Sequence, residues 1–565
     1  MKRFLPVILF LLLALPAVKD LLIPAYFSMH DDLQILRLQQ LDTCLKSGQI
    51  PCRWIPDAGF GYGYSMFNYY PPLPFYLAEA FHLVGLNYFW SVKIVFLLSF
   101  LLPSFFIYLL AKTFFGRTAA FVSAIFYLYA PYHSVDVYVR GALNESWGMV
   151  WFPLTFYAAY QIIATKKTLR YTAMLAFAFA GLLTSHNVMT LIFSPLLGLW
   201  SLYWVWANKD IKKIISLALA AVWGVALSAF FFIPVTLEKS QVHVESMTVG
   251  YFNYMAHFVD INQMFFSRFW GYGGSIWGPD DDMAFPLGHF HWIIAALVGI
   301  ISAVIVIRSI RSIRIIRNSF APVALLLLLF TGIYILLMHP RSIWFWDHLP
   351  LLYYAQFPWR LLAIPTFIFS FLSAYFVFLF FHISKIPRLI CSLFTVSLIT
   401  GVILWNLPFF KIEKPVDITL EEKLSGALWE LQTTGGIFDY LPRAASRPPG
   451  SPAFHFPEFI EGKGDITDYQ KQPAALSFTA QVISPSALIR LPVFAYPDWQ
   501  VRVDGKKIPY SFDADLGRIE LSVPEGNHTI VARYQDTRVR SLANLFSLIT
   551  FAASAIFLFK RRHHI

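Results

Sequence analysis

The chain opens with MKRFLPVILFLLLALPAVKDLLIPAYFSMHDD (residues 1–32), in which two basic residues precede an apolar stretch and two acidic residues follow it. The apolar stretch, residues 4–26, is long enough to cross a bilayer as a helix, which takes about 20 residues. Basic residues favour the cytoplasmic side of such helices. The opening therefore predicts a membrane helix that begins in the cytoplasm and delivers Asp31 and Asp32 to the outer surface.

A cleaved signal peptide is the alternative for this opening, because a basic start followed by an apolar run is also its signature. Lys19 and Asp20 interrupt the run, and apolar character then resumes through residues 21–27. We therefore favour an uncleaved membrane anchor.

The whole chain has the composition of a membrane protein. Hydrophobic residues make up 57% and charged residues only 14%, whereas soluble domains carry about 25% charged residues. The sequence predicts a polytopic α-helical membrane protein of about 12 spans. The apolar stretches are 4–26, 90–111, 118–132, 147–164, 170–185, 188–206, 213–235, 289–307, 321–338, 361–382, 388–407 and 541–559.

The position of the basic residues gives the orientation and argues against a nucleic-acid partner. The net charge is +11, but the excess lies in alternate short loops, where the positive-inside rule explains it. Asp210 is the one acidic residue in these loops. The basic residues are Lys2, Arg3, Lys112, Arg117, Lys166, Lys167, Arg170, Lys209, Lys212, Lys213, Arg308, Arg311, Arg314, Arg317, Lys385, Arg388, Lys560, Arg561 and Arg562. We expect a multi-pass protein of the cell (inner or cytoplasmic) membrane with both termini in the cytoplasm.

Four longer segments then fall outside: 28–89, 133–146, 236–288 and 408–540. We expect a transmembrane domain over 1–407, an outer linker with a short helix over 408–473, and a C-terminal span at 541–559. Alternating residues and the hairpin dipeptide Asp504-Gly505 predict an antiparallel β-domain of about six strands over 474–534.

Two features of the first outer segment leave alternatives open. Its aromatic and proline-rich part, residues 59–74, predicts an interfacial belt or a wall that faces lipid or sugar. Cys44 and Cys52 lie in the same segment, and an oxidising outer compartment permits a disulfide between them. Two free thiols packed in a loop are the alternative.

The acidic pair Asp31-Asp32 is the first candidate for chemistry. Adjacent carboxylates near a low-dielectric boundary raise one another's pKa, which suits a proton acceptor or a cation ligand. A solvated loop is the plainer interpretation. In the second outer segment, Arg140 and Glu145 either pair with each other or present Arg140 to a phosphate.

Further polar residues interrupt the apolar stretches on the same outer side. Together with Arg140 and Glu145, we take these as the candidate substrate-binding residues: His30, His186, Asn187, Gln356 and Arg360. Arg360, in the segment Gln356–Arg360, either extends to the membrane surface or holds an anionic headgroup. An exposed turn is the favoured interpretation of Asp280-Asp281-Asp282.

Several of these segments resemble a known pattern. The acidic pair after the first span, the dozen spans and the outer C-terminal domain resemble integral membrane glycosyltransferases of the GT-C type. Over about residues 1–440 the chain is similar to bacterial membrane proteins labelled "6-pyruvoyl-tetrahydropterin synthase-related". The segments that carry this are Phe67–Pro74, Tyr138–Glu145, Ser185–Asn187 and Gln356–Arg360.

The resemblance implies an enzyme that takes a sugar from a polyprenyl phosphate and gives it to an envelope glycan, lipid or protein. Asp31 and Asp32 correspond to the catalytic acid, as a base or as ligands of a divalent cation, Mg²⁺ or Mn²⁺. Arg140 and Arg360 would stabilise the departing phosphate. The alternatives are a transporter or flippase for lipid-linked glycans, and a non-catalytic scaffold. No pterin chemistry is implied.

The topology can be tested by cysteine labelling. We expect cysteines placed at Asp31 and Asp504 to react with an impermeant maleimide from the outer side of intact cells. This orientation places all of the basic loops on the cytoplasmic side, as the positive-inside rule favours. A cysteine at Lys212 is the matched inner control and should react only after permeabilisation. Labelling of the Asp31 or Asp504 position from the cytoplasm alone would contradict the orientation.

Overall fold

The computed structural model describes residues 5–309, 319–383, 387–436 and 439–562. The basic residues Lys2, Arg3, Arg311, Arg314, Arg317 and Lys385 therefore lie outside the described residues. The chain forms two compact units. Unit 1 comprises residues 1–32, 93–225 and 248–417, and unit 2 comprises residues 33–92, 226–247 and 418–565.

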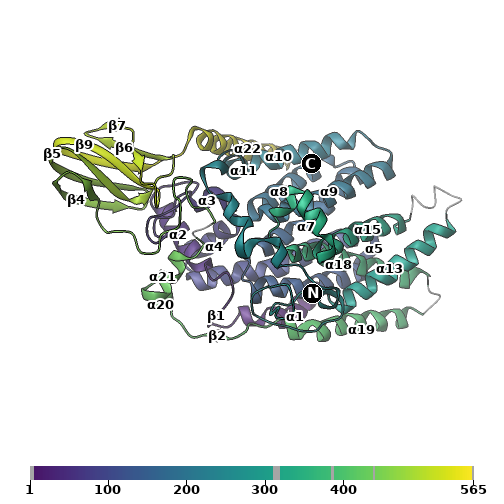
Figure 1. The fold of residues 1–565 in the computed structure, drawn as a ribbon. Helices are drawn as coiled ribbons and strands as arrows, with labels where there is room; N and C mark the ends of the chain where they lie inside the picture. Colours follow the sequence, from purple (N-terminus) through teal and green to yellow (C-terminus); the bar gives the residue numbers. More distant parts are fainter. Residues whose placement is uncertain (1–4, 310–318, 384–386, 437–438, 563–565) are drawn as a thin grey trace. The chain divides into compact units, whose positions relative to one another are not determined.

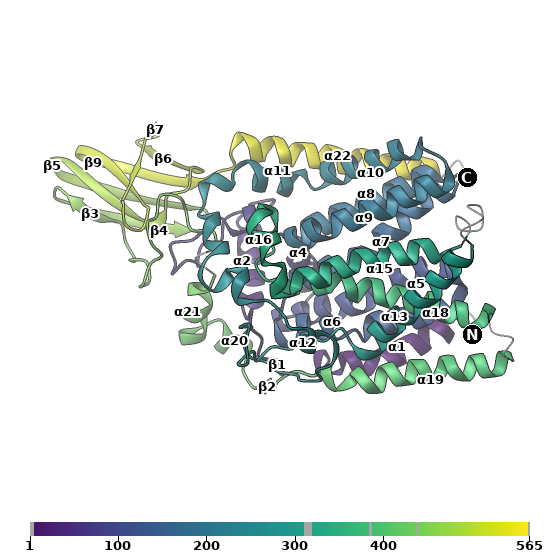
Figure 2. The ribbon, with the colours of Figure 1, turned by 45° about the vertical axis from the view of Figure 1, so that its right-hand side comes forward.

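Helices form at the predicted apolar stretches of unit 1, since a backbone in a bilayer must satisfy its hydrogen bonds internally. Within the unit, α7, α8 and α9 pack together, and α13, α15 and α18 form a second group (Figures 1 and 2). The long helices are α1 (Leu5–Val18), α5 (Tyr88–Leu128), α7 (Leu143–Ala164), α8 (Thr168–Ser185), α9 (Asn187–Asn208), α10 (Lys213–Leu227), α13 (His289–Arg308), α15 (Ala321–Met338), α18 (Ala363–Ile383) and α19 (Arg388–Asn406).

Helix α5 covers two of the predicted stretches, 90–111 and 118–132. The two helical halves meet at Gly116, whose φ of 81° and ψ of 179° are not helical. A residue with a Cβ rarely adopts this conformation, so glycine allows the break.

Seven helices among the described residues are long and apolar enough to cross a membrane, or eight if α10 and α11 (Ala229–Leu237) together make one bent span. The chain is therefore a multi-pass helical membrane protein. The count of about 12 crossings and the direction of each one stay predictions.

Unit 2 contains the predicted antiparallel sheet. Its strands follow the order β3-β5-β9-β6-β7, with β4 beside β5 and β8 beside β9 (Figure 1). The sheet begins at residue 458, before the predicted start at 474, because two strands with mostly exposed polar side chains precede the alternating ones. The strands are β3 (Glu458–Glu461), β4 (Gly464–Gln472), β5 (Ala475–Phe494), β6 (Trp499–Val503), β7 (Lys506–Ile508), β8 (Ser511–Phe512) and β9 (Arg518–Tyr534).

Two local signals in this part of the sequence had different outcomes. The hairpin at Asp504-Gly505 is confirmed: it joins β6 to β7, and both residues have positive φ. The single helix expected over 420–432 is instead two short helices, α20 (Leu420–Lys423) and α21 (Gly426–Thr434). Gly426, with a φ of 56°, separates them.

The aromatic residues of the first outer segment form part of the core of unit 2. Tyr62, Tyr64 and Tyr69 are 5% exposed or less, and the rings of Tyr64 and Tyr69 stack on Tyr440. The expected belt or wall facing lipid or sugar is therefore wrong for these side chains. They contact other aromatic rings of the protein, and such ring pairs contribute to core packing.

A buried arginine ties the C-terminal helix α22 (Arg538–Arg562) to the rest of unit 2. Arg540 is fully buried, and it donates to Glu238 at 2.7 Å, to Asp498 at 2.6 Å and to the Tyr534 hydroxyl at 2.6 Å. Helix α22 also packs along α11. Loss of either carboxylate would leave the buried guanidinium with one partner in place of two, which is destabilising.

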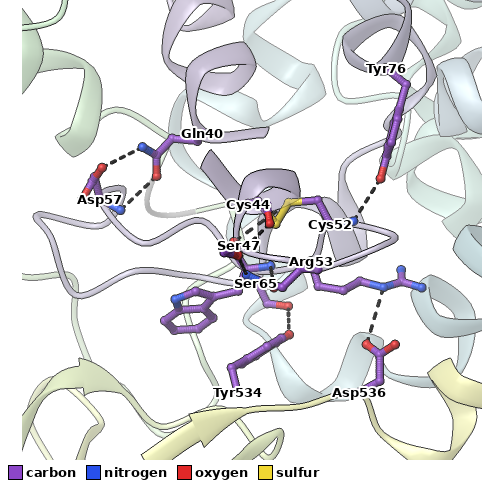
Figure 3. The surroundings of a disulfide bond; sticks show 12 residues. Gln40, Cys44, Ser47, Cys52, Arg53, Asp57, Ser65, Tyr76, Tyr534 and Asp536 are labelled. Carbon is purple, nitrogen blue, oxygen red and sulfur yellow. Dashed lines mark hydrogen bonds and ion pairs between the residues drawn. A yellow bond between two sulfur atoms is a disulfide. The ribbon is translucent and has the colours of Figure 1, made fainter. Parts of the chain in front are cut away.

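A disulfide joins Cys44, on helix α2 (Gln34–Lys46), to Cys52 (Figure 3). The amide of Cys52 donates to the Tyr76 hydroxyl at 2.9 Å, and Gln40 of the same helix donates to Asp57 at 2.8 Å. The bridge and these hydrogen bonds hold the loop after α2 in place.

The disulfide can be tested by counting reactive thiols. We expect one maleimide-polyethylene glycol adduct on the denatured, unreduced protein, at Cys391, and three after reduction. The Cys44→Ser/Cys52→Ser variant should lose about 2.5 kcal/mol of unfolding free energy, the entropy expected for so short a closed loop. The Cys391→Ser control should give no adduct before reduction. Three adducts without reductant would contradict the bridge.

Candidate functional site

The acidic pair Asp31-Asp32 lies in a turn of unit 1 that pairs with the second outer segment. The amides of His30 and Asp31 donate to the carbonyls of Val139 and Arg140, at 3.0 and 2.9 Å. Both aspartates are half-buried. These two backbone hydrogen bonds bring the acidic turn next to the Arg140 segment.

Side chains on either side of the turn fix it further. The Tyr26 hydroxyl, in strand β1 (Tyr26–Phe27), donates to Asp32 Oδ1 at 2.8 Å. The buried ammonium of Lys93 donates to the carbonyls of Ile23 and Ala25, both at 2.6 Å. The acidic pair is thus held on a rigid backbone, and the Asp32 carboxylate has a neutral donor that stabilises its charged form.

Gly141 makes the close approach of the two segments possible. Its φ is 62°, and a Cβ built at this position would lie 2.2 Å from Sδ of Met29, in the turn that carries the acids. A larger residue would suffer both backbone strain and a collision. The sequence contained this glycine between Arg140 and Ala142, but nothing in its local pattern showed what it contacts.

Arg140, Glu145 and Arg360 form a buried ion cluster in the same unit. Arg140 Nη2 lies 2.8 Å from Glu145 Oε2, and Arg360 Nε donates to the same oxygen at 3.1 Å. The Tyr132 hydroxyl donates to the other carboxylate oxygen at 2.5 Å. Arg140 Nη1 also donates to Asp136. One carboxylate therefore holds two guanidinium groups.

The two acids of the cluster have different pKa shifts. Burial raises the pKa of Asp136 well above its usual value, and the Glu145 carboxylate adds to this effect. Burial also opposes ionisation of Glu145, but Arg140 and Arg360 outweigh it and lower the pKa of Glu145 to about 2. The two shifts favour the protonated form of Asp136 and the charged form of Glu145, which moves the charge of the cluster in the positive direction. Guanidinium groups in such a cluster suit an anionic ligand such as a phosphate.

The Gln356–Arg360 segment positions its arginine through its own residues. Arg360 Nη1 donates to the Gln356 side chain at 2.5 Å and to the Ala355 carbonyl at 3.1 Å. The Arg360 guanidinium lies over the Phe357 ring at 4.6 Å, and that of Arg140 lies over the Trp359 ring at 4.4 Å. Both guanidinium groups are thus held by cation–π contacts as well as by ion pairs.

His186 has a structural task at the start of α9 and also lies near the ion cluster. Its Nδ1 accepts the amide of Met189 at 3.0 Å, which caps the helix. Burial is the largest influence on its pKa and lowers it to about 3, while Glu145 partly opposes this shift. Asn187 is the first residue of α9 and is exposed. Neither residue is shown to bind a substrate.

The other sequence candidates make their hydrogen bonds outside the ion cluster. His30 is exposed, and its Nε2 donates to the Tyr272 carbonyl at 2.7 Å. Asp281 accepts from Gln263 at 3.1 Å within a turn, whereas Asp280 is exposed. This is the exposed turn that the sequence favoured.

Within the described residues, no group of three or more His, Cys, Asp and Glu side chains is arranged to hold a metal ion. Asp31 and Asp32 therefore lack a third such ligand from the described chain. Mg²⁺ commonly uses one or two carboxylates with substrate phosphates as its other ligands, so the divalent cation stays a proposal.

Three residues of the site were missed by the sequence analysis. Asp136 lies four residues before Arg140, a spacing that brings side chains together on a helical turn, but the segment read as a loop. The turn Val135–Val139 is in fact a π-helix. Tyr132 and Tyr26 had no signal in the sequence beyond their closeness to the predicted segments.

A protein-family comparison matches part of the chain. The family described as dolichyl-phosphate-mannose-protein mannosyltransferase matches residues 70–237. The match covers less than half of the chain and includes Arg140, Glu145 and His186. It does not include Asp31, Asp32 or Arg360.

One similar protein and two similar structures match the chain at low sequence identity. An uncharacterized protein of Lactococcus lactis subsp. cremoris (strain MG1363) is 24% identical over 207 residues, which are 35% of this chain and 34% of that protein. The match thus spans about a third of the relative's length.

The archaeal oligosaccharyltransferase AglB from Archaeoglobus fulgidus, in complex with an inhibitory peptide and a dolichol-phosphate, has a TM-score of 0.41 and 13% identity, covering 74% of this chain and 57% of that one. ArnT from Cupriavidus metallidurans, bound to undecaprenyl phosphate, has a TM-score of 0.38 and 14% identity, covering 76% of this chain and 74% of that one. Both TM-scores lie below 0.5, so neither likeness establishes a shared fold.

The role of Gly141 can be tested by a matched pair of variants. Gly141→Ala should destabilise the protein by clearly more than Gly250→Ala, as measured by thermal unfolding in detergent. Gly250 has a similar φ of 59° but nothing within 4 Å of its Cβ position, so its variant carries only the left-handed strain of about 1–2 kcal/mol. Equal losses in the two variants would show that Met29 does not approach Gly141 closely.

Proposed function

We propose that this chain is a membrane glycosyltransferase that moves a sugar from a polyprenyl-phosphate donor to an envelope glycan, lipid or protein acceptor. The reaction takes place at the outer face of the cell membrane, with both termini in the cytoplasm. The observation that carries the proposal is the pairing of the acidic turn at residues 30–31 with the arginine segment at 139–140. The mannosyltransferase-family match over residues 70–237 supports it.

The reaction requires a base and a site for the leaving phosphate. The acceptor hydroxyl oxygen forms a bond to the anomeric carbon of the sugar, and the bond from that carbon to the donor phosphate oxygen breaks. Asp31 or Asp32 accepts the hydroxyl proton. The phosphate leaves with the electron pair and gains negative charge, which a fixed guanidinium stabilises most in the transition state.

Arg360 is better suited than Arg140 to hold this phosphate. Both terminal nitrogens of Arg140 already contact carboxylates, those of Asp136 and Glu145. Arg360 contacts Glu145 only through Nε, and its Nη2 makes no hydrogen bond to the described residues. We therefore assign the phosphate to Arg360, with Glu145 and Gln356 as its positioning residues. His30, His186 and Asn187 stay proposed substrate contacts.

The acidic pair has a second possible task as the ligand of a divalent cation. Asp31 and Asp32 would then supply two carboxylates, and the donor phosphate would complete the coordination of Mg²⁺ or Mn²⁺. Such an ion offsets the negative charge of the phosphate. In both cases the backbone pairing holds the acidic turn in place and Tyr26 positions the Asp32 carboxylate.

The proposal is tested by incubating the purified protein with labelled polyprenyl-phosphate sugars and membrane acceptors. Asp31→Asn and Asp32→Asn should each lower turnover by about two orders of magnitude or more if that residue is the base, the usual scale for a lost general base. Arg360→Ala should mainly weaken donor use, whereas Asp280→Asn should change little, because Asp280 is exposed and apart from the cluster.

Normal transfer by the Asp31→Asn/Asp32→Asn double variant, at normal expression, would contradict the mechanism. Movement of a lipid-linked glycan across vesicle membranes without sugar transfer would instead support a transporter or flippase. Absence of both activities would leave the scaffold as the remaining candidate.

A further inference from the structure

The segment between α15 and α18 combines a fixed inner face with an exposed apolar one. It comprises the turn η7 (Pro340–Ser342) and the short helices α16 (Ile343–His348) and α17 (Pro350–Tyr353). Six of its large apolar or aromatic side chains are between 38% and 64% exposed. These are Ile343, Trp344, Phe345, Leu349, Leu351 and Tyr354.

The inner face of the segment is anchored to the rest of unit 1. Trp346 is fully buried, its Nε1 donates to the Leu337 carbonyl at 2.9 Å, and its ring stacks on Tyr254 at 5.1 Å. Tyr254 also stacks on Tyr353 at 5.5 Å and donates a hydrogen bond to Asp347. Trp344 and its neighbours are therefore exposed on a segment whose position is fixed by these contacts.

The position of the segment along the chain restricts what can cover this face. The candidate span α15 ends at Met338, and the next candidate span begins at Pro358. Residues 339–357 thus begin and end at membrane-spanning helices and cannot move far from the membrane surface. Tryptophan is enriched at this depth, where its ring is buried and its N–H stays near water.

A second exposed apolar group lies at neighbouring helix ends of the same unit. Phe266 is 59% exposed and contacts Trp292 near the start of α13, with the ring centroids 6.0 Å apart. Arg268 lies over the ring of Trp405, near the end of α19, at 4.0 Å. These helix ends adjoin the predicted outer segments, as do the end of α15 and the start of α18.

We propose that residues 339–357 form an interfacial anchor, in which α16 and α17 lie in the boundary between lipid headgroups and acyl chains. The six exposed apolar or aromatic side chains are inserted among the lipids. Arg341, exposed at the start of the segment, extends its guanidinium toward the headgroup phosphates. The occupant of the apolar face is the bilayer itself, and the proposal does not depend on the glycosyltransferase function.

The cysteine content of the chain permits a clean test. Cys44 and Cys52 form a disulfide and Cys391 is buried, so a Cys391→Ala background leaves one reactive thiol for each introduced cysteine. Spin labels at Trp344→Cys and Leu351→Cys are measured in full-length protein, in nanodiscs of phosphatidylcholine and phosphatidylglycerol. Two positions guard against one variant failing to fold.

Collision rates with oxygen, which partitions into lipid, and with a water-soluble nickel chelate report the depth of each label. Leu329→Cys, 68% exposed on α15, is the lipid control, and Asp280→Cys is the water control. We expect the oxygen-to-nickel ratio at Trp344→Cys and Leu351→Cys to exceed that at Asp280→Cys several-fold and to approach that at Leu329→Cys.

Two results would overturn the proposal. Ratios equal to that at Asp280→Cys would place the face in water. Labels shielded from both reagents would show that protein covers the face, and spin–spin broadening would then identify a second copy of the chain as the cover.

Discussion

The buried carboxylate of Glu145 is the constraint on which the arrangement of the candidate site depends. It carries a negative charge among side chains that exclude water, and a buried charge without a partner costs several kcal/mol. Arg140, in the second outer segment, and Arg360, in the Gln356–Arg360 segment, offset this energetic cost by pairing with Glu145. They can do so only if both segments lie next to Glu145. The carboxylate thus ties together residues more than 200 positions apart, and the acidic turn joins them through its backbone pairing with residues 139–140.

The sequence predicted what depends on local composition. The apolar stretches predicted the helices of unit 1, and Asp504-Gly505 predicted the hairpin between β6 and β7 of unit 2. Bilayer crossing and a tight turn are each decided by consecutive residues. The sequence also left Arg140 and Glu145 open between an ion pair and a phosphate site. The structure has the ion pair. Their spacing could not choose between the two, since a third residue, Arg360, shares the same carboxylate.

Features that depend on distant partners could not be predicted. The aromatic residues 59–74 looked interfacial because composition does not distinguish rings that face lipid from rings that face other rings. The partner Tyr440 lies far along the chain from Tyr64 and Tyr69. Arg540 likewise has no signal in the local sequence, yet it holds Glu238 and Asp498 together. Buried ion clusters of this kind specify tertiary contacts without leaving a local pattern.

The same carboxylate that fixes the two arginines also limits what they can bind. A guanidinium nitrogen that is already paired with Glu145 or Asp136 is less available to a phosphate. Both terminal nitrogens of Arg140 contact these carboxyl groups, whereas Nη2 of Arg360 makes no hydrogen bond to the described residues and the Arg360 guanidinium lies over the Phe357 ring. An arginine already fixed by stacking loses little conformational entropy when it binds an anion. Under the proposed function, such an arginine would stabilise the charge that develops on the leaving phosphate, because its donors need not reorganise when that charge appears.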